Sequence, residues 1–125
     1  MARLQHAAVT FPPGRETAIR DFYGVTLGLP TTTVPPEVAH LGWIWFATDD
    51  EAVELHFIPS DLAPDPARQH HFCLEVDDLA LIRGRLERAG AEVSEAGHRI
   101  LDRERLFVRD PVGNLVELIQ YLPAR

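Results

Sequence analysis

The sequence predicts an α+β fold in which two βαβββ modules follow one another in a single chain. Two observations predict it. Each half contains stretches with the two-residue apolar period of half-buried strands, arranged around one stretch with helical spacing. The tripeptide Val-Glu-Leu occurs at 53–55 and again at 116–118, and a histidine opens each half, His6 and His71, 65 residues apart. Such an internal repeat indicates one structural unit used twice.

The first module is expected to begin with a strand at 4–11, which ends at two prolines and a glycine. A helix is expected over 15–29, because apolar residues recur there at helical spacing and the stretch runs out at Gly28-Leu29-Pro30. Its buried stripe is predicted to consist of Ala18, Ile19, Phe22 and Tyr23.

Three further strands are expected to complete this module. Residues 31–34 are β-branched and stop at a pair of prolines, and residues 43–47 are rich in aromatic side chains and precede an acidic turn. Residues 53–58 alternate apolar side chains with Glu54 and His56, which is the period of a half-buried strand.

The second module, 71–122, repeats the order of the first, about 1–58, after a linker at 59–70 that contains prolines. Its helix is expected at 79–89, with Asp77 or Asp78 as the N-cap and Gly90 at the C-terminal end. The stripe that this helix buries is predicted to be Leu79, Ile82 and Leu86. Its strands are expected at 71–76, 91–93, 106–109 and 115–121, with a loop at 95–103.

The last two strands are predicted to form a hairpin. The residues between them, 110–114, include Asp, Pro, Gly and Asn, which favour tight turns for different backbone reasons. Within the final strand Glu117 lies among apolar neighbours. A carboxylate at such a position either points to water on an exposed face or needs a partner such as a metal ion.

The composition excludes several classes of function. The net charge is −7, with 12 Lys and Arg against 19 Asp and Glu, which disfavours nucleic acid and anionic membrane as partners. No stretch approaches the roughly 20 apolar residues of a membrane span, and we expect no signal peptide. Cys73 is the only cysteine, so no disulfide forms within the chain, and we expect a cytoplasmic protein. Zinc-ribbon, Walker and GxGxxG motifs do not occur.

The repeat also predicts a site. A lone histidine on a strand is usually structural, but the repeat places a histidine and a glutamate at equivalent positions in both modules. If the modules fold alike and pair, His6, Glu54, His71 and Glu117 converge around a pseudo-twofold axis. Two imidazoles and two carboxylates suit Zn, Ni, Co, Mn or Fe(II) and leave coordination positions for water or substrate.

The stretch Asp-Pro-Val-Gly-Asn-Leu-Val-Glu-Leu at 110–118 resembles the hallmark of the vicinal oxygen chelate superfamily. Residues 22–29 and 71–79 also resemble motifs of this family, so the resemblance covers nearly the whole chain. The family includes glyoxalase I, bleomycin and fosfomycin resistance proteins, methylmalonyl-CoA epimerase and extradiol dioxygenases. The resemblance implies one domain, 1–125, in which the modules form an open, curved cup of mixed β-sheet. It also implies a metal ligand from each of four strands, by position His6, Glu54, His71 and Glu117.

Other residues compete for roles in this site. His56 shares a strand face with Glu54 and is the alternative ligand there, although the repeated Val-Glu-Leu favours Glu54. His70 is expected at the rim, and His40 and His98 in loops. The candidates for the substrate pocket are Trp43, Trp45, His56, Cys73 and Arg105. For Trp43 and Trp45, which share one face of their strand, core packing is the favoured role, and for Cys73 it is that of a small buried core residue. For Arg105, as for Arg68, Arg99 and Arg103, solvated surface is the favoured interpretation.

Three functions follow from the resemblance. The first is a glyoxalase-I-like lyase or isomerase, in which one divalent metal per site stabilises an enediolate of a small oxygen-chelating substrate and Glu117 or Glu54 moves the proton. The second is an Fe(II) extradiol-type dioxygenase. The third is a drug-binding protein without catalysis, similar to bleomycin resistance proteins. A homodimer is expected, because family members of this length are commonly dimers.

Overall fold

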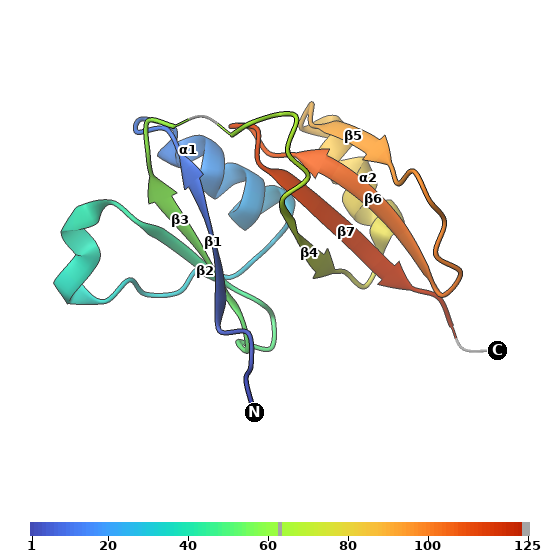
Figure 1. Cartoon of the computed structure of the whole chain (residues 1–125), viewed down its shortest axis with the longest axis horizontal. Helices are drawn as coiled ribbons and strands as arrows, with labels where there is room; N and C mark the ends of the chain where they lie inside the picture. Colours follow the sequence, from blue (N-terminus) through green and yellow to red (C-terminus); the bar gives the residue numbers. More distant parts are fainter. Residues whose placement is uncertain (63, 124–125) are drawn as a thin grey trace.

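The computed structural model describes residues 1–62 and 64–123 and confirms the α+β fold class. The first sheet has the order β1-β3-β2 (Figure 1). Its strands are β1 (His6–Phe11), β2 (Ile44–Ala47) and β3 (Glu54–Pro59). Strand β3 lies in the centre, parallel to β1 and antiparallel to β2.

The second sheet has the order β4-β7-β6-β5. Its strands are β4 (His71–Glu75), β5 (Glu92–Glu95), β6 (Arg103–Arg109) and β7 (Leu115–Tyr121). Strand β7 is parallel to β4 and antiparallel to β6, which confirms the predicted hairpin. In each sheet the first strand of a module therefore pairs with the last one, and this places residues far apart in the sequence side by side.

Both predicted helical regions are helical. Helix α1 (Glu16–Ile19) continues as a π-helical segment, Arg20–Thr26, before Gly28 adopts a positive φ of 76°. Helix α2 (Leu79–Arg88) begins at Asp78, whose side chain accepts a hydrogen bond from the backbone N–H of Leu81 at 3.0 Å. No helix in the described part of the chain is both long and apolar enough to cross a membrane.

The predicted strand at 31–34 is wrong. Only Thr31 makes a bridge, to Phe46, because prolines at 30, 35 and 36 remove backbone donors on both sides of this stretch. A 3₁₀ helix, Pro36–Leu41, follows, which the sequence analysis did not predict. It contains no buried residue and projects away from the two sheets (Figure 1). The predicted linker 59–70 includes Ala63, which lies outside the described residues.

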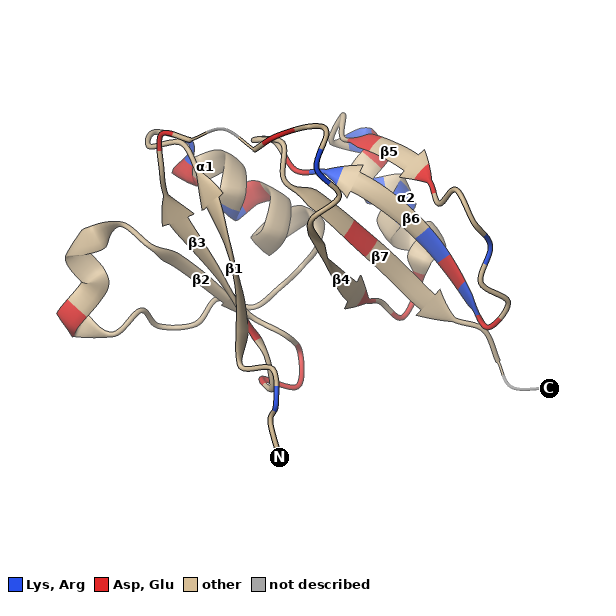
Figure 2. Ribbon diagram, in the orientation of Figure 1, with Lys and Arg blue, Asp and Glu red and all other residues tan. Residues whose placement is uncertain are grey.

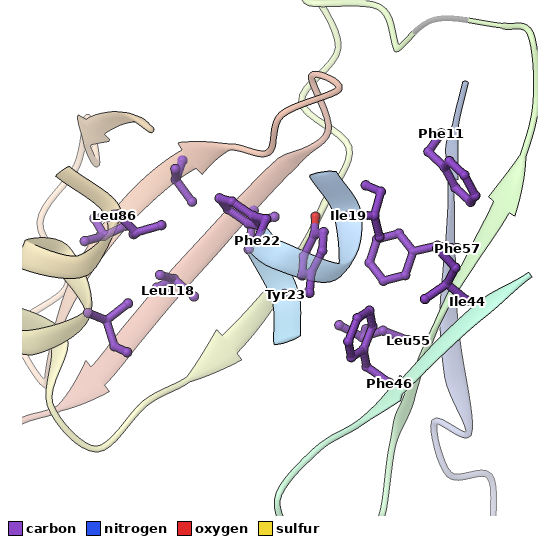
Figure 3. Close-up of a cluster of buried hydrophobic side chains, with 14 of the residues drawn as sticks. Phe11, Ile19, Phe22, Tyr23, Ile44, Phe46, Leu55, Phe57, Leu86 and Leu118 are labelled. Atoms are coloured by element: carbon purple, nitrogen blue, oxygen red, sulfur yellow. The ribbon is translucent and has the colours of Figure 1, made fainter. Parts of the chain in front are cut away.

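Both modules contribute to one hydrophobic core (Figure 3). The ring of Tyr23, from the first helical region, lies 4.4 Å from the ring of Phe57 in β3 and 6.3 Å from that of Phe72 in β4. The predicted stripe of α2, Leu79, Ile82 and Leu86, is buried against the second sheet. Because side chains alternate along a strand, each sheet turns one face to this core and keeps the other face open.

A buried polar network joins the hairpin turn to the first module. The Tyr23 hydroxyl donates to Asp110 Oδ2 at 2.7 Å, and Asp110 Oδ1 accepts from the backbone N–H groups of Val112 and Asn114. The Asn114 side-chain amide donates to Asp110 and to the carbonyl of Thr10 in β1. The motif at 110–114 therefore fixes the turn and ties the two modules together.

We expect Tyr23→Phe to destabilise the fold by about 1–3 kcal/mol, because buried Asp110 loses a donor. The matched control is Tyr121→Phe, at an exposed position where a change of roughly 0.5 kcal/mol or less is expected. Burial, with the Asp110 charge and hydrogen bond, raises the pKa of Tyr23 well above its usual value. The stabilisation is therefore present at neutral pH and lost as the pH rises above about 10. Urea unfolding at pH 7 and at alkaline pH measures both effects, and equal stabilities for the two variants at pH 7 would contradict the network.

Candidate metal centre

The open face of the second sheet carries an acid–base cluster built by three strands. Glu117 in the middle of β7 accepts from Arg105 Nε of β6 at 2.8 Å through Oε2, and its Oε1 lies 3.0 Å from His71 Nε2 of β4. Figure 2 shows the acidic band of β7, where Glu117 is the only acidic residue, beside the basic bands of β6. His71 and Glu117, two of the four predicted ligands, therefore lie in contact.

The environment keeps Glu117 ionised. Burial by itself raises the pKa of this carboxyl, but the hydrogen bonds from Arg105 and His71, together with their charges, outweigh burial and lower the pKa below its usual value. The side chains of Arg105 and Glu117 are 16% and 12% exposed, so this ion pair is screened less than a surface pair. At neutral pH the carboxylate is thus in the form that binds a metal ion or accepts a proton.

The ring of His71 is held between the Gln69 carbonyl and Glu117. His71 Nδ1 lies 2.7 Å from the backbone carbonyl of Gln69, and a carbonyl oxygen only accepts, so Nδ1 carries a proton. In the neutral ring Nε2 then presents a lone pair to Glu117 Oε1, and two acceptors face one another at 3.0 Å. Either a second proton on the ring or a metal ion resolves this contact. A backbone carbonyl that holds the distal N–H is also the usual support of a metal-binding histidine.

The open face of the first sheet carries a second cluster, organised by Gln5. The Gln5 amide nitrogen donates to Glu54 Oε1 at 3.2 Å, and its amide oxygen accepts from Nδ1 of His6. This arrangement leaves Nε2 of His6 with its lone pair. Gln5 was not predicted, because nothing in the sequence distinguishes it except its position before His6. It orients both residues that are predicted to bind metal in this module.

His56 is buried between two rings and supports Glu54. Its Nε2 lies 3.0 Å from Glu54 Oε1, and this hydrogen bond is the main reason that the pKa of Glu54 is lowered, against the opposing effect of burial. The His56 ring stacks on Trp45 at 3.7 Å and on His6 at 4.1 Å, with interplanar angles of 2° and 16°. A ring held in this way by Glu54 positions that carboxylate, which favours Glu54 over His56 as the ligand.

Trp43 and Trp45 share one strand face, as predicted, but they lie on the open face and outside the buried core, so the favoured role in core packing is wrong. Their rings are 6.4 Å apart and nearly parallel, at 15°. Trp45 Nε1 is buried, and among the described residues it is the one buried side-chain nitrogen or oxygen that has no hydrogen-bond partner. An unpaired buried donor of this kind costs about 1–3 kcal/mol of folding stability.

The two clusters stay separate within one chain. In the part of the chain that the structure describes, no group of three or more His, Cys, Asp and Glu side chains is arranged to hold a metal ion. Each cluster still contains one histidine and one glutamate, which is half of the predicted ligand set. Two cis ligands of an octahedral ion, with bonds of about 2.1 Å, lie about 3.0 Å apart, which is the distance between His71 Nε2 and Glu117 Oε1. The donor types fit a divalent metal, and the full four-residue set stays a prediction.

A pocket of about 390 Å³ opens beside His71, a member of the cluster on the second sheet, between β1 and β4. His71 and Phe72 line it on one side and residues 7–10 of β1 on the other. Its volume lies in the range of small-molecule sites. His71 is therefore the predicted ligand with direct access to a cavity.

Other candidate residues are placed differently from the predictions. Cys73 is exposed on the open face next to Glu117 and is not the buried core residue that was favoured, because β4 turns its alternate residues away from the core. Desolvation of its thiol, with the Glu117 charge, raises the pKa of Cys73 to about 11, so it is a neutral thiol at pH 7. Arg105 is not solvated surface but is bound to Glu117 and to the carbonyl of His98. His40, His70 and His98 are exposed, as predicted, but His40 lies in the 3₁₀ helix Pro36–Leu41 and not in a loop.

Comparison with known proteins agrees with the sequence motifs. A family model described as the Glyoxalase/Bleomycin resistance protein/Dioxygenase superfamily matches residues 3–118. A search of curated proteins finds no match.

Solved structures of similar fold cover nearly the whole chain. A glyoxalase family protein from Bacillus anthracis is 29% identical, with a TM-score of 0.85 over 98% of this chain and 97% of that one. A glyoxalase/dioxygenase from Nostoc punctiforme is 21% identical, with a TM-score of 0.81 over 97% and 92%. TnmS3, an antibiotic binding protein from Streptomyces sp. CB03234, is 22% identical, with a TM-score of 0.73 over 98% of both chains. The last two likenesses show the fold alone.

Proposed function

The chain belongs to the glyoxalase/bleomycin resistance protein/dioxygenase superfamily, and on this premise we propose that it is a divalent-metal-dependent lyase or isomerase of the glyoxalase type. Its substrate is a small molecule with two neighbouring oxygens. The observation that carries the proposal is the contact of His71 Nε2 with Glu117 Oε1 at 3.0 Å, the separation of two ligands of one metal ion, on a ring whose Nδ1 is held by the Gln69 carbonyl. When bound, the metal supplies a Lewis acid that holds both substrate oxygens.

Four residues hold the metal in this proposal: His6, Glu54, His71 and Glu117. Gln5 orients His6 and Glu54, and the carbonyl of Gln69 orients His71. Glu117 is the base that moves a proton between adjacent carbons, since its carboxylate is ionised and lies on the open face. Arg105 then acts by holding the second oxygen of Glu117 in place.

We also propose that the functional unit is a homodimer. Each chain presents half of the ligand set on each of two open sheet faces, and a twofold axis would bring the first module of one chain to the second module of its partner. This arrangement would complete two identical sites. It is supported by the separation of the two clusters in one chain and by the presence of a histidine and a glutamate in each of them. The strand pairing differs between the modules, since Glu54 lies opposite His6 and Glu117 lies opposite Cys73.

Proton exchange next to a carbonyl tests the reaction class. Hydroxyacetone, which has two vicinal oxygens, is incubated in D₂O with the zinc-, nickel- or cobalt-loaded protein, and loss of its proton signals is followed by NMR. We expect metal-dependent exchange, slowed about 10²- to 10⁴-fold in Glu117→Gln. Glu75→Gln, on the open face of β4, is the matched control. Equal rates for wild type and Glu117→Gln would refute Glu117 as the base.

The aromatic wall favours a second candidate, a protein that binds a small aromatic molecule without changing it. Trp43 and Trp45 suit binding whether or not chemistry follows. The paired histidine and glutamate residues favour the metal-dependent enzyme. The dioxygenase alternative needs two histidines and a single carboxylate, so it requires Glu54 to be free of the metal or replaced by His56. Oxygen consumption with Fe(II) and a catechol tests it.

A further inference from the structure

We propose that the pocket beside His71 binds an anionic group of the substrate, a phosphate or a carboxylate, and that Arg109 is the residue that holds it. The ligand class is a small molecule with two neighbouring oxygens at one end and this anionic group at the other. The inference rests on the proposed function only for the two oxygens, because binding of the anion by Arg109 needs no metal.

The pocket carries positive charge in an acidic chain. Two arginines, Arg68 and Arg109, line it together with a single carboxylate, that of Asp65. Arg68 lies 3.6 Å from Asp65, and its side chain is 66% exposed, so water screens this pair. The charge of Arg109 is then left without compensation. Since the chain as a whole has a net charge of −7, a positively charged pocket is where we expect a small anion to bind.

The guanidinium of Arg109 is held in place but not neutralised. Its Nη1 donates to the carbonyl of Gly113 at 3.1 Å, and its Nη2 donates to the carbonyl of Pro66 at 3.2 Å. It is partly buried and forms no ion pair with any carboxylate in the described part of the chain. Glu92, which lies opposite Arg109 on β5, is exposed.

This arrangement suits recognition of an anion. The two carbonyls occupy two of the five N–H donors of the guanidinium, so the others remain for a ligand. Because the carbonyls come from the linker and from the turn at 110–114, the planar fork is fixed before a ligand arrives. Such a fork matches the oxygens of a carboxylate or a phosphate.

The register of the second sheet places Arg109 on the same face as the metal-binding cluster. His71, Leu115 and Arg109 lie opposite one another on β4, β7 and β6, and all three line the pocket. Since neighbouring strands are about 4.8 Å apart, the backbones of His71 and Arg109 are roughly 10 Å apart. A molecule of a few carbon atoms can therefore place its anionic group at Arg109 and its two oxygens near His71.

The opposite wall of the pocket contributes backbone groups. Residues 7–10 of β1 line it, and β1 is an edge strand that pairs only with β3 among the described strands. An edge strand has N–H groups without a partner strand, and these can donate to an anion. On this edge the carbonyl of Thr10, which would repel an anion, already accepts from the amide of Asn114.

Two pairs of hydroxyketones test the anionic group. Dihydroxyacetone phosphate differs from dihydroxyacetone by the phosphate. The acid 5-hydroxy-4-oxopentanoate differs from 1-hydroxypentan-2-one by a carboxylate in place of a methyl group. We expect the charged member of at least one pair to bind the wild type roughly tenfold more tightly in titration calorimetry, with and without Zn²⁺. The pair with the larger ratio identifies phosphate or carboxylate as the group that binds.

Variants of Arg109 show whether this preference depends on the pocket. Arg109→Gln should abolish it, and Arg109→Lys should keep part of it, because lysine retains the charge but not the planar fork. Arg85→Gln is the matched control, since it removes an exposed arginine of α2 that does not line the pocket. No preference in either pair, or a preference that Arg109→Gln leaves unchanged, would overturn the proposal.

A readout on the wild type does not depend on how the variants fold. The Nε–H resonance of Arg109 in a ¹H–¹⁵N spectrum should shift with the charged member of the preferred pair and much less with the uncharged one. A resonance that responds equally to both members, or to neither, would contradict the role of Arg109.

The proposal and the proposed function fail separately. If no metal binds but the preference for the charged member persists and depends on Arg109, the anion site stands and the metal-dependent reaction does not. If Zn²⁺ binds at the four predicted ligands but charged and uncharged members bind equally, the metal site stands and the anion site is overturned.

Discussion

Two variants that each lack one half of the site are expected to bind metal together but not separately. The first carries His6→Ala and Glu54→Ala, and the second carries His71→Ala and Glu117→Ala. In a homodimer whose sites combine the first module of one chain with the second module of the other, each variant alone has no intact site. The mixed dimer regains one of its two sites, because the wild-type modules of the two chains meet there.

The measurement is metal content after the variants are unfolded together, refolded and separated by two different tags. The isolated mixed dimer should contain about one ion per two chains, and wild type about one per chain. Each variant refolded alone, with a native circular dichroism spectrum, is the control. A mixed dimer without metal would place the whole site within one chain and contradict the proposed dimer.

The second large effect is expected at Glu54, compared with its neighbour His56. Glu54→Ala should weaken metal binding by more than about a hundredfold, because it removes a ligand. His56→Ala should weaken it by only about 10- to 100-fold, because His56 holds Glu54 by one hydrogen bond. His56→Gln should recover most of this loss, since its amide can donate to the same oxygen.

Calorimetric titration with Zn²⁺ ranks these variants, and Glu51→Ala, in the turn before β3, serves as the control for loss of a nearby carboxylate. The reverse order, with His56→Ala the more damaging and His56→Gln no better, would make His56 the ligand on β3. The ligand set would then be three histidines, His6, His56 and His71, with Glu117 as the single carboxylate, which would favour the dioxygenase alternative.

The sequence predicted correctly which side chains share a strand face, because side chains alternate along a strand. The period of two places Glu54 and His56 on one face and buries Leu55 and Phe57 on the other, and the structure has this arrangement. The repeat predicted a histidine and a glutamate at equivalent positions of both modules, but the strand pairing differs, since His6 lies opposite Glu54 and Cys73 lies opposite Glu117. The strand predicted at 31–34 was wrong. Its β-branched residues favour a strand, but the prolines beside them remove the hydrogen bonds that a strand needs.

The supporting contacts of the site could not be predicted. Arg105 reaches Glu117 only because the turn at 110–114 sets a register in which Phe107 lies opposite Glu117 and Arg105 lies two pairs further along, on the same face. Gln5 and the carbonyl of Gln69 fix the ring nitrogens of His6 and His71 through local backbone geometry. No periodicity in the sequence predicts these contacts, because each one depends on where the fold places one side chain or one backbone carbonyl.

The most direct test of the account is the metal content of the purified chain, prepared without chelators or metal-affinity resin. The account predicts about one divalent ion per chain, lost in Glu117→Ala and retained in Glu75→Ala, a carboxylate on the open face of β4. Nickel, cobalt or zinc would support the lyase or isomerase, and iron would favour the oxygenase. A chain that contains no ion and takes up none when Zn²⁺, Ni²⁺, Co²⁺, Mn²⁺ and Fe²⁺ are added would contradict the metal centre.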